Sequence, residues 1–164
     1  MKAHQDGDLH RAFSIFLFND QGKMLVQQRA DSKYHFASLW SNACCSHQRL
    51  DESNLTAAHR RLPEELGFDT ELTEVFTFLY QAHDPQTGLI EHELDTVLVG
   101  VYNGTTEQFN PKEVKAVRWL SIAELFLDID KHPSSYTLWF KIALAEMKQR
   151  KLLSIAKIKK TTTS

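Results

Sequence analysis

The chain has 164 residues, 42% of them hydrophobic, and a formal net charge of −2. This length and composition predict a single globular domain over residues 1–164, with enough apolar side chains for a core. The near-zero charge argues against nucleic acid as a partner, and no apolar run approaches the roughly 18 residues of a membrane span.

The first predicted element is a β-hairpin. An apolar, aromatic-rich run at residues 12–18 is followed by the turn sequence Asn19-Asp20-Gln21-Gly22 and by a second run at residues 23–29. Turn residues between two runs of this kind indicate a pair of antiparallel strands.

A helix is predicted next, over residues 54–66. Its apolar residues recur at steps of three, four and four, which is the period of a helix face; they are Leu55, Ala58, Leu62 and Leu66. Ser53 or Asn54 is the expected N-cap, and Gly67 follows the expected end. Pro63 lies in the last turns, where it removes a backbone hydrogen bond and is expected to kink or shorten the helix.

Three more strands are predicted at residues 75–80, 91–102 and 114–120. Ser121 and Glu124 form a capping-box pattern that opens a short helix, and a final helix is predicted from about Ser135 to beyond Gln149. Residues 150–164 are expected to be a frayed basic tail. This order of elements predicts an α+β (mixed α/β) domain in which helices flank a mixed sheet.

The two cysteines, Cys44 and Cys45, are adjacent, and neighbours in sequence almost never form a disulfide with each other. Free thiols indicate a reducing compartment. Charged residues near the start, at Lys2, Asp6 and Asp8, leave no room for the core of a signal peptide. We therefore expect a cytoplasmic protein, and a monomer is favoured.

Three acidic residues, Glu91, Glu93 and Asp95, alternate along one predicted strand and would share one of its faces. Carboxylates so close together repel each other unless a cation lies between them, and a divalent metal is the usual solution. The alternative is an exposed edge strand with solvated acids, which this pattern taken alone favours.

The same alternation at Cys45-Ser46-His47 would bring a thiol and an imidazole together and turn Cys44 away, as a small buried hydrophobe. His4 and His10 lie in a polar segment too short to be core, so they either face solvent or bind a metal. Three histidines and two glutamates would form a mixed nitrogen and oxygen ligand set suited to Zn²⁺, Mn²⁺ or Mg²⁺.

Residues 46–68 resemble the signature of Nudix domains, a loop-helix-loop that holds a divalent metal on a diphosphate. The matching residues are Glu52, Arg60, Glu64, Glu65, Gly67 and Phe68. The chain departs from the signature at Arg61, where the pattern has a glutamate, and at Ser46, where it has a glycine. An arginine at this place can bind a phosphate. The structural alternative is a set of ordinary ion pairs on the helix surface.

A closer resemblance runs from about residue 4 to 145. The strings that carry it are His10-Arg11-Ala12-Phe13-Ser14, Gln28-Arg29-Ala30-Asp31-Ser32-Lys33, Asn42-Ala43-Cys44-Cys45-Ser46-His47, Arg60-Arg61-Leu62, Glu64-Glu65-Leu66-Gly67, Glu91-His92-Glu93 and Tyr136-Thr137-Leu138-Trp139-Phe140. In order and spacing they resemble the type I isopentenyl diphosphate isomerases, a Nudix-like family that tolerates the missing glutamate. The resemblance implies that the chain interconverts isopentenyl diphosphate and dimethylallyl diphosphate by protonation and deprotonation.

The resemblance also implies roles for individual residues. It implies a tightly held Mn²⁺, Zn²⁺ or Mg²⁺ with the ligands His4, His10, His47, Glu91 and Glu93, and a Mg²⁺ that enters with the diphosphate and is held through Glu65. It implies three catalytic residues, Cys45, Glu93 and Tyr80, and four that bind substrate, Arg29, Lys33, Arg61 and Trp139. We expect Glu93, backed by Tyr80, to deliver a proton, and Cys45, with a lowered pKa, to take one from the other face.

Two other functions compete with this hypothesis. The first is a Nudix hydrolase of a nucleoside diphosphate derivative, against which Arg61 argues, because a hydrolase needs the glutamate that it replaces. The second is a non-catalytic metal-binding domain on the same fold, against which the retained Cys45, Glu91 and Glu93 argue.

Overall fold

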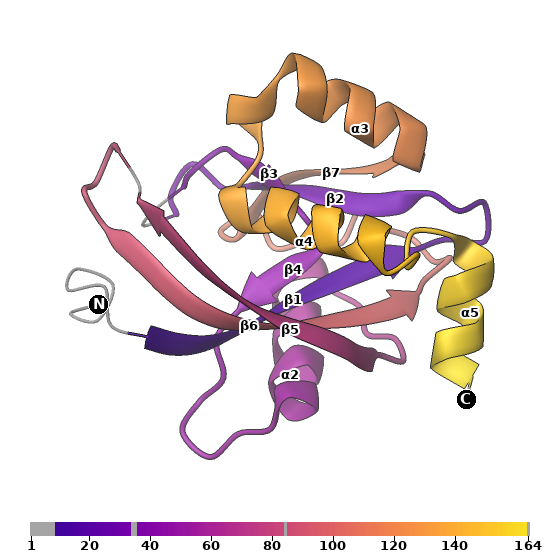
Figure 1. Cartoon of the computed structure of the whole chain (residues 1–164). Helices are drawn as coiled ribbons and strands as arrows, with labels where there is room; N and C mark the ends of the chain where they lie inside the picture. The colour runs from indigo at the N-terminus through magenta and orange to yellow at the C-terminus, as the bar shows by residue number, and fades with distance from the viewer. Residues whose placement is uncertain (1–8, 34–35, 84, 164) are drawn as a thin grey trace.

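The computed structural model describes residues 9–33, 36–83 and 85–163. The strands are β1 (Leu9–Phe18), β2 (Met24–Arg29), β3 (Trp40–Ser41), β4 (Cys44–Ser46), β5 (Thr73–His83), β6 (Ile90–Val101) and β7 (Val114–Leu120). The helices are α2 (Asn54–Leu66), α3 (Ile122–Lys131), α4 (Leu138–Gln149) and α5 (Ile155–Thr163), with a 3₁₀ turn at Pro133–Ser135. The strands form one mixed sheet in the order β3-β2-β1-β6-β5, with β4 paired to β1 and β7 to β2 (Figure 1).

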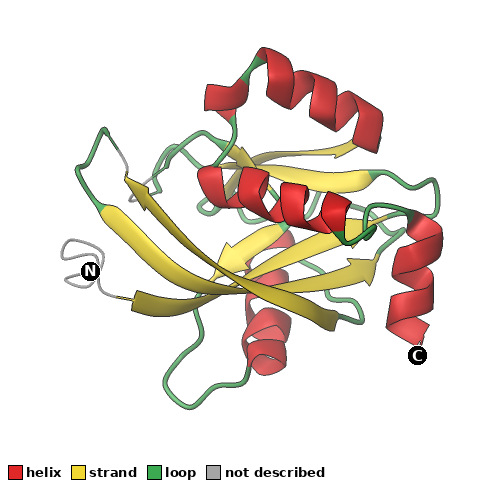
Figure 2. Ribbon diagram, viewed as in Figure 1, coloured by secondary structure: helices red, strands yellow, loops and turns green. Residues whose placement is uncertain are grey.

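Helices cover both faces of this sheet (Figure 2). On one face, α2 packs through Ala58 and Leu62 against a cluster that includes Phe13 and Leu98 from β1 and β6. On the other face, α3, α4 and α5 pack against a larger aromatic cluster that includes Phe16. The chain therefore has the predicted α+β architecture, with two apolar cores on opposite sides of a central sheet.

Helix α2 has the predicted bounds and caps. The Ser53 side chain accepts a hydrogen bond from the backbone N–H of Thr56, and Gly67 ends the helix in the left-handed region at φ 79°. A Cβ at Gly67 would lie 2.4 Å from the carbonyl oxygen of Gln108, so only glycine fits there. The expected shortening at Pro63 was wrong: the helix continues to Leu66, and the Pro63 carbonyl accepts from the Gly67 N–H at 2.9 Å.

The predicted hairpin and capping box are confirmed. Strands β1 and β2 pair antiparallel next to the turn, with Phe18 opposite Met24. Strands β5 and β6 form a second antiparallel pair, with Tyr80 opposite Glu93. Ser121 and Glu124 make both hydrogen bonds of the capping box at the start of α3.

The C-terminal part differs from the prediction in two ways. Helix α4 starts at Leu138 rather than Ser135, because residues 133–135 form a 3₁₀ turn, and it ends at Gln149. The segment expected to be a frayed tail at residues 150–164 instead contains α5, whose Ile158 is fully buried in the aromatic cluster. Of the helices in the described part of the chain, none has the length and hydropathy of a membrane-spanning segment.

Candidate active site

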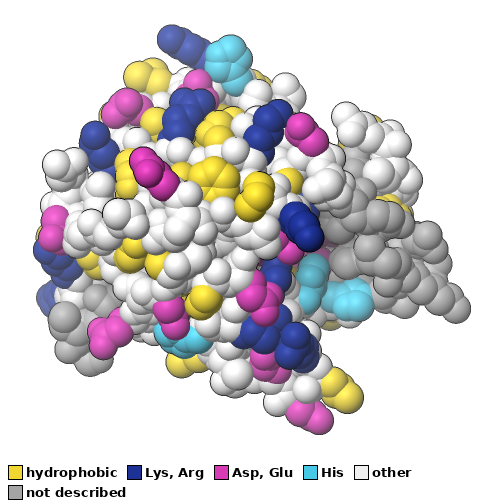
Figure 3. All heavy atoms as spheres, turned by 180° about the vertical axis from the view of Figure 1, so that it is seen from behind, with side chains coloured by type: hydrophobic (Ala, Val, Ile, Leu, Met, Phe, Trp, Pro, Cys, Tyr) yellow, Lys and Arg dark blue, Asp and Glu magenta, His cyan; other side chains and the backbone are white. Residues whose placement is uncertain are grey.

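A cavity of about 200 Å³ lies where β4 and the first halves of β1 and β6 come together. It is lined by Ala12, Phe13, Arg29, Lys33, Cys45, Ser46, His47, Arg61, Tyr80, Glu91, Glu93, Asp95 and Trp139. Nine of these residues were predicted as site residues from the sequence. Figure 3 shows acidic, basic and histidine side chains meeting in one region of the surface, right of centre.

The other three predicted residues are not among these lining residues. His10 does not line the cavity, but its ring is next to that of His47, with 6.3 Å between the ring centroids. Glu65 is buried beside the cavity, where it accepts a hydrogen bond from Gln27. His4 lies outside the described residues.

Strand pairing places Cys45 in the cavity. It lies opposite Ser14 of β1, and alternation along β4 sends Cys44 into the core on the other face, where it is fully buried. The Sγ of Cys45 lies 2.9 Å from the Oδ1 of Asn42 and accepts a hydrogen bond from the indole Nε1 of Trp139, also at 2.9 Å. The hydroxyls of Ser14 and Ser41 each lie a further 3.7 Å from the Sγ, so the thiol is held by four polar contacts, two of which join it to distant parts of the chain.

The expected lowering of the Cys45 pKa was wrong. Burial, with a smaller contribution from the nearby charge of Asp95, raises the pKa of this thiol to about 12. Hydrogen bonds from Ser14 and Ser41 and the charge of Arg29 act in the opposite direction but are weaker. The thiol is the resting form of Cys45 in this environment.

The three acidic residues of β6 share one face and are all buried, with exposed fractions of 3% for Glu91, 0% for Glu93 and 2% for Asp95. The alternative of an exposed edge strand is wrong, because β6 is central, between β1 and β5. Burial raises the pKa of Asp95 to about 8, and burial likewise raises that of Glu93. Three buried carboxyl groups this close together are stable only if some of them are protonated or if a cation binds between them.

Histidine and tyrosine side chains flank these acids. The sheet registers place His10 on one side of Glu93 and Tyr80 on the other. The Nε2 of His47 is 2.9 Å from the Oε1 of Glu93. The hydroxyl of Tyr80 donates a hydrogen bond to the Oε2 of Glu91 at 3.0 Å. Tyr80 was expected to back Glu93, but its hydrogen bond goes to the neighbouring acid of the same strand face. Burial lowers the pKa of His47, but the hydrogen bond and charge of Glu93, with the other two acids, raise it above its usual value.

This donor set fits a divalent cation. Within the described ranges, no group of three or more His, Cys, Asp or Glu side chains has the geometry of a ready-made metal site. His10, His47, Glu91 and Glu93 nevertheless come from one sheet face and the loop beside it, and they offer imidazole nitrogens together with buried carboxylates. The Oδ1 of Asp95 is buried and makes no hydrogen bond. A cation among these groups would relieve the repulsion between the acids.

Three cations also line the cavity. Lys33 and Arg61 both form ion pairs with Glu113, that of Arg61 at 3.4 Å. The guanidinium of Arg29 lies 5.3 Å from the ring centroid of Trp139, in a cation–π contact. Cations from the end of β2 and the residues after it, and from α2, therefore line the same cavity, as an anionic group would require.

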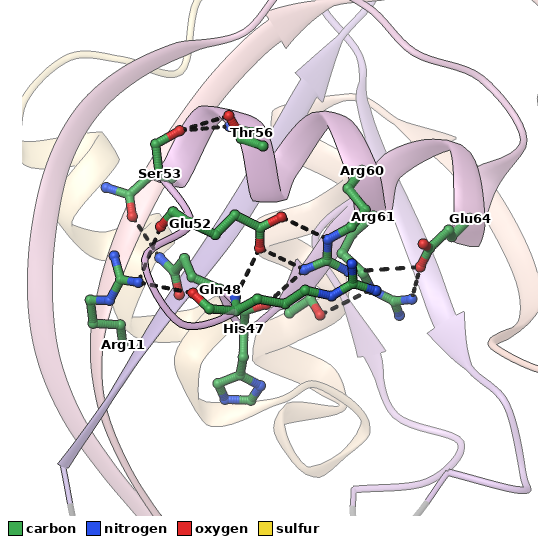
Figure 4. Close-up of polar contacts among 12 residues, drawn as sticks. Arg11, His47, Gln48, Glu52, Ser53, Thr56, Arg60, Arg61 and Glu64 are labelled. Atoms are coloured by element: carbon green, nitrogen blue, oxygen red, sulfur yellow. Dashed lines mark hydrogen bonds and ion pairs between the residues drawn. The ribbon is translucent and has the colours of Figure 1, made fainter.

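The residues of the Nudix signature on helix α2 also form the ion pairs that were its structural alternative. The guanidinium of Arg60 donates two hydrogen bonds of 2.9 Å to the carboxylate of Glu52 (Figure 4). A third hydrogen bond runs from Arg60 to the backbone carbonyl of His47 at 3.3 Å. Arg61 donates to Glu65 at 2.7 Å. The Arg60–Glu52 pair thus ties the loop that carries His47 to the helix.

Comparison with known proteins identifies the family. A match to the family described as "NUDIX domain" covers residues 8–140. The "Isopentenyl-diphosphate Delta-isomerase" of Serratia proteamaculans is 48% identical over 89% of this chain and 80% of its own length. The chain belongs to the isopentenyl-diphosphate Delta-isomerases of the Nudix family. The "Isopentenyl-diphosphate Delta-isomerase 2" of Aromatoleum aromaticum is 45% identical, over 88% of this chain and 75% of its own length.

Solved structures show the fold that this isomerase family shares with other Nudix proteins. The MutT protein of Methanosarcina mazei Go1 superimposes with a TM-score of 0.71 at 14% identity, covering 87% of this chain and 95% of its own. A NUDIX hydrolase from Nitrosomonas europaea gives 0.63 at 17% identity, covering 90% and 93%. At these identities the likeness concerns the fold alone, which confirms the predicted Nudix-like domain.

Sequence reasoning missed several residues of the site. Asp95 was placed on the right face but not assigned to the site. Ser14 and Asn42, which contact Cys45, belong to strings used for the resemblance but have no motif of their own. Glu113 joins Lys33 to Arg61 from the segment before β7, and no sequence pattern singled it out.

Proposed function

We propose that this protein interconverts isopentenyl diphosphate and dimethylallyl diphosphate. The observation that carries the proposal is a cavity whose lining combines a thiol, carboxyl groups and an aromatic ring with three cations, those of Arg29, Lys33 and Arg61. A five-carbon alkene with a diphosphate needs both kinds of group, because its two ends differ completely in polarity.

Arg29, Lys33 and Arg61 bind the diphosphate. All three line the cavity, and Lys33 and Arg61 are brought together by Glu113. When Arg61 turns from Glu65 to a phosphate, it frees the Oε2 of Glu65, the residue we assign to the magnesium ion that enters with the diphosphate. Binding at this end positions the hydrocarbon, so remote binding energy orients the reacting carbons.

The reaction adds a proton to one carbon and removes another from a carbon two positions away. An alkene is a weak base, so the acid must be strong and well placed. We assign Glu93 as the donor and Cys45 as the acceptor, one on each side of the hydrocarbon. Because Cys45 rests as the thiol, its proton must first leave. The Ser14 hydroxyl, 3.7 Å from the Sγ and 2.8 Å from the Oδ2 of Asp95, can relay it to that carboxylate. The Trp139 N–H stabilises the thiolate that then accepts the proton from the substrate. Tyr80 acts through its hydrogen bond to Glu91 and holds the neighbouring acid in place.

A divalent cation (Mn²⁺, Zn²⁺ or Mg²⁺) held by His10, His47, Glu91 and Glu93, with His4 as a further ligand, would supply Lewis acidity that strengthens Glu93 as an acid. The aromatic rings of Trp139 and Tyr80 exclude water from the cationic intermediate, and the π face of Trp139 accepts positive charge. Water excluded in this way can neither capture the intermediate nor hydrolyse the allylic product.

The test is incubation with isopentenyl diphosphate and Mg²⁺ in deuterated water, followed by NMR. The expected result is dimethylallyl diphosphate that carries deuterium. Cys45→Ala and Glu93→Gln should each abolish conversion while the protein stays folded, and Cys44→Ala is the matched control, because that thiol points into the opposite core. Full turnover by either variant would contradict the assignment. Release of phosphate from nucleoside diphosphate derivatives would instead support a Nudix hydrolase.

A further inference from the structure

A second hollow lies next to the catalytic cavity. It has a volume of about 260 Å³, and its lining includes the side chains of Phe36, Leu39, Tyr136 and Leu138, which are mainly apolar. Leu138 is the neighbour of Trp139, which lines the catalytic cavity. The two hollows therefore lie on either side of the start of α4.

Phe36 and Trp139 together stand between these two spaces. The Phe36 ring lines the second hollow and meets the ring of Trp139 edge-on, with 5.5 Å between centroids and 82° between planes. Trp139 in turn packs against Tyr80, another cavity residue, with 6.3 Å between the ring centroids. The Phe36 and Trp139 rings thus form a two-ring wall, and Phe36 is the layer farther from Cys45.

The backbone at Phe36 is held in an unusual conformation. Its φ is 54°, in the left-handed region that bulky residues rarely adopt, and such a conformation persists only where the surroundings fix it. Here Arg29 fixes it: its Nε donates to the Phe36 carbonyl at 3.1 Å, and its backbone N–H and carbonyl pair with Leu39 and Ser38 at 2.8 and 3.1 Å.

Arg29 also places its guanidinium over Trp139. One side chain therefore touches the diphosphate end of the cavity, the tryptophan and the backbone of Phe36. Arg29, which we assign to the diphosphate, thus also positions the Phe36 and Trp139 rings. The distance between the bound diphosphate and this two-ring wall is therefore fixed.

We propose that Phe36 is a specificity-determining residue that limits the hydrocarbon of the substrate to five carbons. Its ring backs Trp139, the layer that faces the cavity, so removing it leaves space into which the Trp139 ring can shift, and the cavity gains room for additional carbon. The inference rests on the proposed isomerase function and adds a size limit to it. A well-packed apolar wall discriminates against one added methylene by about 10- to 200-fold.

The test compares isopentenyl diphosphate with its six-carbon homologue, 3-ethylbut-3-enyl diphosphate. The wild-type protein should use the homologue with a kcat/KM at least about tenfold lower. Phe36→Ala should raise the ratio of kcat/KM for the homologue to kcat/KM for the natural substrate by about tenfold or more. Phe36→Leu should raise this ratio by a smaller factor. The leucine variant keeps the test decisive if the alanine variant does not fold.

Phe126→Leu is the matched control, because Phe126 is an aromatic residue of α3 that lines neither hollow. Its substrate ratio should equal that of the wild type. If the wild type isomerises the natural substrate and the Phe36 variants leave the ratio unchanged, the inference is wrong and the proposed function stands. If the wild type converts neither substrate, both are wrong.

Discussion

The hydrogen bond from Trp139 to Cys45 offers a sharp test of the proposed chemistry. The Nε1···Sγ distance is 2.9 Å, and both groups are largely buried, with Trp139 only 3% exposed. Trp139→Phe keeps an aromatic face over the hydrocarbon but removes the N–H donor. Hydrogen bonds to charged groups contribute about 1.5–3 kcal/mol. If negative charge develops on Sγ during proton removal, kcat should fall by about 10- to 150-fold, since about 1.4 kcal/mol is a factor of ten.

The assay is kcat for conversion of isopentenyl diphosphate, with thermal unfolding measured alongside. Trp139→Leu should be slower still, because it loses the aromatic face as well. Trp119→Phe is the matched control: Trp119 packs against the core on the α2 side of the sheet, so kcat should not change. Full kcat in Trp139→Phe would refute the view that this N–H stabilises the thiolate.

Three other predictions follow from contacts away from the thiol. The hydrogen bonds from Arg60 hold the pKa of Glu52 down to about 2, so the stability from this pair is full above pH about 4.5 and is lost as the pH falls toward 2. Glu52→Gln should therefore reduce the dependence of the urea-unfolding free energy on pH over that range. An unchanged pH dependence would count against the pair. Ile158→Ala should cost about 2–5 kcal/mol in urea unfolding, whereas no loss would mean that α5 does not dock. Elemental analysis should find a divalent metal in the wild type and less in His47→Ala; equal content would remove His47 from the ligand set.

Local patterns predicted most of the elements. The alternation of Cys44 and Cys45, and of the acids on β6, is a property of any strand, so the faces were assigned correctly. The depth of those acids could not be predicted, because it depends on β1, a parallel partner some 80 residues earlier in the chain. Local sequence does not reveal whether a strand is central or at an edge.

The errors share this origin in tertiary contacts. The pKa of Cys45 was expected to fall because a metal and cationic residues were expected nearby, but burial and Asp95 outweigh Arg29. The effect of Pro63 was overestimated because helix propensity is a weak guide once a face such as that of Leu62 and Leu66 is buried. The basic composition after Gln149 concealed α5, whose docking depends on a few apolar residues such as Leu152 and Ile158.

The pairing of Tyr80 with Glu93 ties catalysis to the way β5 and β6 are aligned. Side chains alternate with a period of two, so inserting one residue at the start of β6 would turn Glu91 and Glu93 toward the α2 side and bring His92 into the cavity. Changes of length should be tolerated only outside the paired segments, at residues 85–89. Evolution can therefore vary the tip of this hairpin freely, while its arms tolerate substitutions but not insertions or deletions.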